Sequence, residues 1–181
     1  MNETMNAILN RYSCRAYTDE PVNDEALKML ADAALAAPTA MNRQAYRVVI
    51  IKDKALIDKM DAECMESLKN MEDQSTYNRF MERGGTLFYN ATAMFMLPIE
   101  KGSQTDLGIV AQNICLAAQS LGLGSCHCGM ARLIFDGGRK EAYEKLFQFP
   151  KGYEFGLAVL VGHSAKTAAA HPLDESKVLY I

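Results

Sequence analysis

The chain of 181 residues contains no tryptophan, only five prolines and no apolar run long enough to cross a membrane. Its longest mainly apolar stretch, residues 91–97, is far short of the roughly 20 residues that a membrane-spanning helix needs. A basic excess is also missing, because 19 Lys and Arg stand against 22 Asp and Glu, a net charge of −3. Proteins that neutralise many nucleic-acid phosphates are usually basic. We therefore expect neither a membrane span nor a nucleic-acid partner.

Cysteines are few and odd in number, five in all, and no segment typical of a signal peptide is visible. This pattern favours reduced thiols and a cytoplasmic location. Residues 126–128 are Cys, His and Cys, three adjacent side chains that could bind a metal ion. The other cysteines fall in separate predicted elements, so we predict no metal site. A catalytic cysteine paired with His163 or His171 stays open, although no pattern singles it out.

The composition is that of an ordinary globular protein, with 49% hydrophobic and 23% charged residues. Eleven methionines supply flexible side chains that fill an irregular core or a permissive pocket. No repeat, low-complexity tract or flexible linker divides the chain. We expect one domain over residues 1–181.

Periodicity predicts helices over residues 4–11, 24–37, 54–71, 105–121 and 139–147. Asn23 is a typical cap for the second helix, and Pro38 should stop it. The helix over 105–121 is apolar nearly all round, so a second surface such as a partner subunit should cover its outer side. No firm shape is predicted for residues 73–83.

Apolar runs predict strands over residues 48–51, 91–97 and 155–161, whereas 125–130 fits a strand edge or a turn. The β-branched run at 48–51 is typical of a central strand, and Pro98 should close the next one. The tail, residues 163–181, ends in four apolar or aromatic residues. We expect it to pack on its own domain or on a partner.

Two arginines four positions apart, Arg11 and Arg15, flank the hydroxyl of Ser13 next to Tyr12. Guanidinium groups and a hydroxyl match a phosphate in charge and in hydrogen-bond donors. The alternative, a solvated helix end with two surface arginines, remains open on spacing alone.

The loop at 38–44 joins a helix end to a strand and offers the amides of Asn42 and Gln44. Amides suit the edge of a heterocycle, although Asn is also common in turns for conformational reasons. The glycines at 122 and 124 end a helix rather than open one, so they are not a dinucleotide-binding fingerprint.

Together these motifs resemble the FMN-dependent nitroreductase family, and the likeness runs from about residue 5 to about residue 175. The first motif resembles the family's Arg-X-Ser-X-Arg/Lys signature. The second resembles its loop after the next helix, and residues 106–124 are similar to its long central helix. The matching residues of the first two motifs are Arg11, Ser13, Arg15, Ala37, Pro38, Thr39, Asn42 and Gln44.

The resemblance implies an α+β fold in which helices flank a central, mixed but mainly antiparallel sheet, in an intertwined homodimer with FMN at the interface. One subunit would hold the phosphate, ribityl chain and pyrimidine side, the other would add its 38–44 loop, and a backbone N–H near residue 128 or 129 would face flavin N5. The implied cofactor-binding residues are Arg11, Tyr12, Ser13, Arg15, Pro38, Thr39, Ala40, Asn42, Gln44, Cys128, Gly129 and His171.

Two departures from the family pattern are visible. Ala170-His171 stands where the family commonly has Arg or Lys before Pro-Leu, so His171 would bind phosphate more tightly as the pH falls through roughly 6 to 7. Ala45-Tyr46 replaces the family's Pro-Trp pair.

The implied activity is ping-pong transfer of reducing equivalents from NAD(P)H through FMN to a small acceptor such as a nitroaromatic or a quinone. An FMN storage, sensor or delivery protein is the alternative. A dehalogenase or flavin-fragmenting enzyme ranks third, because the only unassigned stretch is short for a lid.

Overall fold

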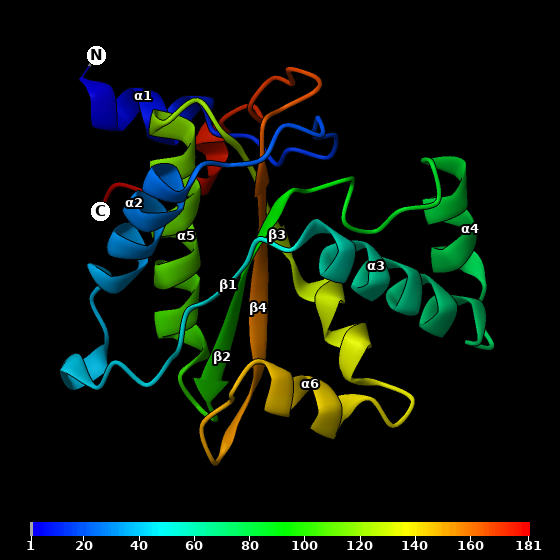
Figure 1. Cartoon of the computed structure of the whole chain (residues 1–181). Coiled ribbons are helices and arrows are strands. Elements are labelled where there is room, and N and C mark those ends of the chain that lie inside the picture. The colour runs from blue at the N-terminus through cyan, green and yellow to red at the C-terminus, as the bar shows by residue number, and fades with distance from the viewer. Residues whose placement is uncertain (1) are drawn as a thin grey trace.

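Four strands form one antiparallel sheet in the order β1-β2-β4-β3 in the computed structural model, which describes residues 2–181 (Figure 1). An isolated parallel bridge joins Ser13 to Ser125 beside it. The predicted α+β class with a mainly antiparallel sheet is confirmed. The strands are β1 (Val49–Ile51), β2 (Ala93–Glu100), β3 (Gly124–Cys128) and β4 (Tyr153–Gly162).

Helices cover both faces of the sheet, with α1, α2 and α5 on one side and α3, α4 and α6 on the other (Figure 1). Side chains alternate along β2, so Met94 and Met96 join one buried cluster while Phe95 and Leu97 join the other. The helices are α1 (Glu3–Asn10), α2 (Asp24–Leu35), α3 (Lys54–Lys69), α4 (Ser75–Glu82), α5 (Gln104–Ser120) and α6 (Lys140–Leu146). Short 3-10 turns are η1 (Ala40–Asn42), η2 (Gly129–Phe135) and η3 (Glu175–Lys177).

The predicted helices are confirmed, and their caps show why they begin where they do. Asn23 accepts a hydrogen bond from Ala26 N at 2.8 Å, as expected for the cap of α2. Asp53 likewise accepts from Ala55 N at 3.0 Å at the start of α3. Residues 73–83, for which no shape was predicted, contain α4 and bury Phe80 against the core.

Two strand predictions were wrong in detail. The run at 48–51 is an edge strand, not a central one, since β1 pairs only with β2 and Ile50 is 37% exposed. Pro98 does not close β2: the strand continues to Glu100 after a register shift between Leu97 and Pro98. A bulge lets the sheet accommodate a residue without an N–H. Of the two alternatives for residues 125–130, the strand is correct, as β3.

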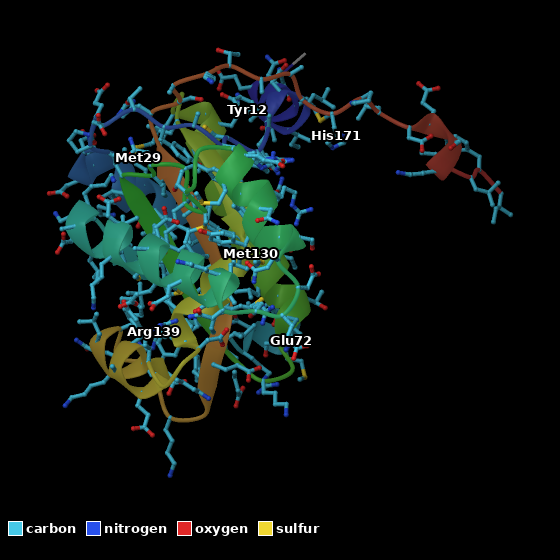
Figure 2. The ribbon with its side chains drawn as sticks, turned by 90° about the vertical axis from the view of Figure 1, so that its right-hand side faces the viewer. Tyr12, Met29, Glu72, Met130, Arg139 and His171 are labelled. Carbon is cyan, nitrogen blue, oxygen red and sulfur yellow. The ribbon has the colours of Figure 1, made fainter. Side chains whose placement is uncertain are left out.

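The tail leaves the sheet after β4 and extends away from the body of the chain (Figure 2). Its apolar residues are exposed, among them Leu173 at 70% and Leu179 at 80%. The tail therefore does not bury these side chains on its own domain. Within residues 2–181, the helices are all too short or too polar to cross a bilayer.

Candidate functional site

The segment after α1 lies along the start of β3. Cys14 N donates to Ser125 O at 2.9 Å, and the bridge between Ser13 and Ser125 fixes the register. Gly124 permits this contact, because a Cβ built there would lie 2.7 Å from Cys14 Sγ. The backbone thus presents Ser13 and its neighbours at the edge of the sheet.

A cavity of about 240 Å³ opens beside this segment, lined by Arg11, Tyr12, Ser13, Arg15, Ala168, Ala169 and His171. The first motif and the tail histidine, far apart in sequence, therefore meet at one place, and Figure 2 shows Tyr12 and His171 at the same end of the molecule. Within residues 2–181 neither Arg11 nor Arg15 forms an ion pair. Two guanidinium groups without a carboxylate partner suit an anion.

Tyr12 bonds the start of the tail to the segment that carries Arg11 and Arg15. Its hydroxyl lies 2.7 Å from Ser164 Oγ, and Ser164 Oγ lies 3.1 Å from Cys14 Sγ and donates to Lys166 O at 2.9 Å. These bonds place residues 166–171 over the arginines. Tyr12 thus has a structural role in addition to lining the cavity.

The arginines also act on the groups beneath them. Burial raises the pKa of the Cys126 thiol, and the positive charges of Arg15 and Arg11 oppose that rise. Desolvation lowers the pKa of His127, and the charge of Arg11 lowers it further. The positive charge of the arginines therefore acts on side chains at both faces of β3.

The loop at 38–44 has an unusual backbone, because Met41, Asn42 and Gln44 have φ values of 52°, 53° and 49°. Non-glycine residues in this left-handed region are uncommon and often occur at functional sites. Gln44 N donates to Thr39 Oγ1 at 3.0 Å, and Gln44 Nε2 donates to Asn42 Oδ1 at 2.8 Å. The two predicted amides are thus already held together, and Met41 beside them is 89% exposed.

The loop lies near one end of α5, and α1, which leads into Arg11, lies near the other end (Figure 1). Ala40 N donates to Asp106 Oδ1 at 3.1 Å, in the first turn of α5. A pocket lined by α1 and by Gln119 and Ser120 places Asn10, next to Arg11, at the last turn. Fourteen helical residues separate the two turns by about 20 Å. One chain therefore does not bring the two predicted halves of the site together.

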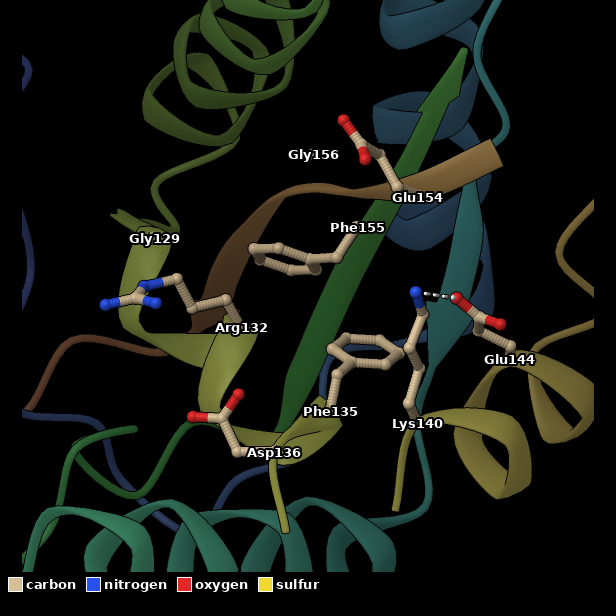
Figure 3. Close-up of a pocket in the computed structure, with 9 residues that line it drawn as sticks. All are labelled: Gly129, Arg132, Phe135, Asp136, Lys140, Glu144, Glu154, Phe155 and Gly156. Atoms are coloured by element: carbon tan, nitrogen blue, oxygen red, sulfur yellow. Dashed lines mark ion pairs between the residues drawn. The ribbon is translucent and has the colours of Figure 1, made fainter. Parts of the chain in front are cut away.

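Cys128 and Gly129 lie where β3 ends and η2 begins, three and four residues beyond Ser125. Three residues of strand span about 10 Å. Gly129 lines a larger cavity of about 660 Å³ between η2, α6 and β4, shown in Figure 3. Phe135 and Phe155 form one of its walls, with ring centroids 5.5 Å apart. The arginine cavity and this larger cavity thus lie along the same strand.

The cysteines do not resemble activated nucleophiles. All five are free and buried. Burial raises the pKa of Cys115 to about 11 and that of Cys128 to about 12, and it also raises the pKa of Cys64. A nucleophilic cysteine needs a lowered pKa. Within residues 2–181, no three His, Cys, Asp or Glu side chains gather where they could hold a metal ion.

Comparison with known proteins identifies the family. The nitroreductase family matches residues 8–163. The chain belongs to the nitroreductase family. It is similar to a nitroreductase with bound FMN from Desulfitobacterium hafniense DCB-2, at 47% identity and a TM-score of 0.96, over 100% of this chain and 99% of that one.

Two curated relatives in Bacillus subtilis (strain 168) are more distant. One, an FMN reductase (NADPH), is 28% identical over 99% of this chain and 73% of its own length. The other, an FMN reductase [NAD(P)H], is 29% identical over 95% of this chain and 70% of its own length. The family resemblance read from the sequence is confirmed.

Sequence reasoning missed some of the residues that surround the arginines in this nitroreductase-family chain. Ala168 and Ala169 line the cavity but carry no chemical signal of their own.

Proposed function

We propose that the protein is an FMN-dependent oxidoreductase that uses NADH or NADPH to reduce a small oxidised acceptor, such as a nitroaromatic or a quinone, by a ping-pong mechanism. The observation that carries the proposal is the cavity lined by Arg11, Ser13 and Arg15 in a chain 47% identical to an FMN-bound nitroreductase. Both curated relatives named above are FMN reductases.

The donors around this cavity fit the phosphate of FMN. Two guanidinium groups without an ion pair in the described chain and one hydroxyl supply both charge and hydrogen bonds to a dianion. His171 also lines this cavity. The roughly 10 Å from Ser125 to Cys128 suits a five-carbon ribityl chain between the phosphate and a ring near Gly129.

We further propose a homodimer of single-domain subunits in which each FMN site is built by both chains. Loop 38–44 and the arginines lie at opposite ends of α5, so the loop of one subunit must meet the arginines of the other to complete a site. The strained backbone of Met41, Asn42 and Gln44 fits a loop that is shaped to contact a ligand.

Exposed apolar surface supports the same assembly. Ile109, on the outer side of α5, is 37% exposed, and the tail exposes Leu173, Val178 and Leu179. Apolar groups of this kind gain free energy when a partner covers them. We infer that the tail packs on the partner subunit.

The redox chemistry would be the cofactor's: FMN held by Arg11, Ser13 and Arg15 would supply the transfer of reducing equivalents between NAD(P)H and the acceptor. The chain's own contribution is to bind and orient. Arg15 supplies positive charge, which stabilises the negative charge that a flavin gains on reduction. The cavity of about 660 Å³ beside Gly129 offers room for a donor or acceptor, with the aromatic wall of Phe135 and Phe155.

The absorption spectrum of the purified protein is the primary test. We expect flavin bands near one FMN per chain, and bleaching when NADH or NADPH is added under nitrogen. Bands that neither nucleotide bleaches would support a storage, sensor or delivery protein instead. A colourless protein that takes up no FMN would refute both.

Subunit complementation tests the shared site. Arg11→Ala and Asn42→Ala homodimers should each bind FMN weakly, since every site lacks one contact. Random mixing of the two variants should restore about a quarter of wild-type sites, because half of the dimers are mixed and each has one intact site. No gain on mixing would show that each site draws both residues from one chain.

A further inference from the structure

Strand β4 carries one extra residue, Gly156, where it pairs with β2. The register places Leu157 opposite Leu97 but Phe155 opposite Pro98, so Gly156 is inserted between the two pairs. An insertion of this kind is a β-bulge, which bends the strand and can point a side chain in a new direction.

The bulge places Phe155 on the opposite face of the sheet from Leu157. Side chains two positions apart on a regular strand share a face. Here Leu157 packs against the buried cluster that contains Leu107 of α5, whereas Phe155 packs against the cluster that contains Ile57 of α3. On a regular strand Phe155 would therefore point toward α5.

Only glycine fits at the bulge. A Cβ built on Gly156 would lie 2.5 Å from Leu107 Cδ2 and 2.8 Å from both Ile99 Cγ2 and Leu97 O. The last of these atoms belongs to the backbone of the paired strand, which cannot turn aside as a side chain can. Gly156 thus permits the close approach of β4 to β2 that keeps Phe155 on the α3 side.

On that side Phe155 lines the cavity of about 660 Å³ beside Gly129 (Figure 3). Its ring centroid lies 5.5 Å from that of Phe135, at an interplanar angle of 41°, and Phe149 packs on Phe135 in turn at 5.6 Å. Phe135 and Phe155 line the cavity and are only half-buried. Aromatic rings attract one another beyond the free energy of burying their area, so this wall favours a ligand with a flat ring.

The charged side chains of the cavity do not favour an anion. Lys140 pairs with Glu144 at 3.8 Å (Figure 3). Arg132, Asp136 and Glu154 complete the charged lining, so three carboxylates stand against two cations. A negatively charged ligand gains no net attraction from this set. The lining therefore favours an uncharged ring.

We propose that Phe155, turned into the cavity by the Gly156 bulge, is a specificity-determining residue that forms with Phe135 a stacking site for the flat, uncharged ring of the acceptor. The inference rests on the proposed function, because Gly129 connects this cavity to the position proposed for the flavin ring. The two phenylalanines bind the ring and transfer neither protons nor electrons.

Calorimetric titration of the FMN-loaded protein with benzamide and with cyclohexanecarboxamide separates stacking from burial. The two compounds share the carboxamide and are similar in size, but only benzamide has a flat aromatic ring. The wild type should bind benzamide about three- to tenfold more tightly, the range expected for an aromatic pair.

Phe155→Leu keeps an apolar side chain at a half-buried position, so the fold is retained. The variant should lower the preference for benzamide to less than about twofold, because one of the two stacking rings is lost. The KM for nitrobenzene, an uncharged aromatic acceptor, should rise by about the same factor.

Phe147→Leu is the matched control. Phe147 belongs to the same group of aromatic rings, 6.3 Å from Phe149, but lines a different pocket. The change should lower stability and leave the preference for benzamide as it is in the wild type. Benzoate tests the charge of the cavity, and it should bind the wild type no more tightly than benzamide does.

The inference is overturned if the wild type binds neither carboxamide or binds both equally, or if Phe155→Leu keeps the full preference. It is also overturned if Phe147→Leu loses the preference to the same extent, or if benzoate binds more tightly than benzamide. A failure of the proposed function is a different result, since the wild type would then take up no FMN or hold FMN that neither nicotinamide reduces.

Discussion

Replacing Arg11 by Gln tests the proposed phosphate site most directly. Arg11 is half-buried, lines the cavity and has no ion pair within residues 2–181. Its attraction for an anion is therefore weakened neither by a neighbouring carboxylate nor by full exposure to solvent. A hydrogen bond to a charged group contributes about 1.5–3 kcal/mol. Because 1.4 kcal/mol is a factor of ten, the Kd for FMN should rise roughly 10- to 150-fold.

Riboflavin has the same ring and ribityl chain but no phosphate, which makes it the internal control. Flavin fluorescence titrations at constant salt should show a large loss of FMN affinity and little change for riboflavin. Arg47→Gln serves as the control variant, because Arg47, an exposed arginine, likewise has no ion pair in the described chain but lines a different pocket. The reasoning is refuted if FMN and riboflavin weaken by the same factor, or if FMN binds Arg11→Gln as tightly as wild type.

Three other substitutions give distinct outcomes. Arg15→Ala should lower the flavin midpoint potential in reductive titration, and an unchanged potential with FMN still bound would remove Arg15 from that role. Tyr143→Phe leaves the Glu63 carboxylate without its 2.5 Å donor, so the free energy of unfolding measured in urea should fall by about 1–2 kcal/mol. An unfolding free energy equal to that of the wild type would contradict this expectation. Desolvation and then the charge of Arg11 lower the pKa of His127, so the unfolded chain binds the proton more tightly and stability should fall as the pH drops through about 6.5. His127→Gln should flatten that fall in unfolding measured between pH 7.5 and 5.5, whereas an identical pH profile would contradict the assignment.

The helices and the family could be predicted from sequence because local signals specify them. The Asn23 cap, the apolar stripe of residues 105–121 and the Arg11-to-Arg15 spacing depend on neighbours a few positions away. The strand at 48–51 was misplaced because a β-branched run favours a strand but does not tell whether one or two others pair with it. Pro98 was misread because only the register of β2 with β4 shows a bulge there.

Local sequence patterns specify most of the elements, the family and the candidate residues of the proposed phosphate site. Tertiary packing brings His171 to the cavity that Arg11 lines and separates loop 38–44 from that cavity along α5. These relations join residues far apart in the chain. They depend on how strands pair and helices pack, which the order of apolar and polar residues along the chain does not specify.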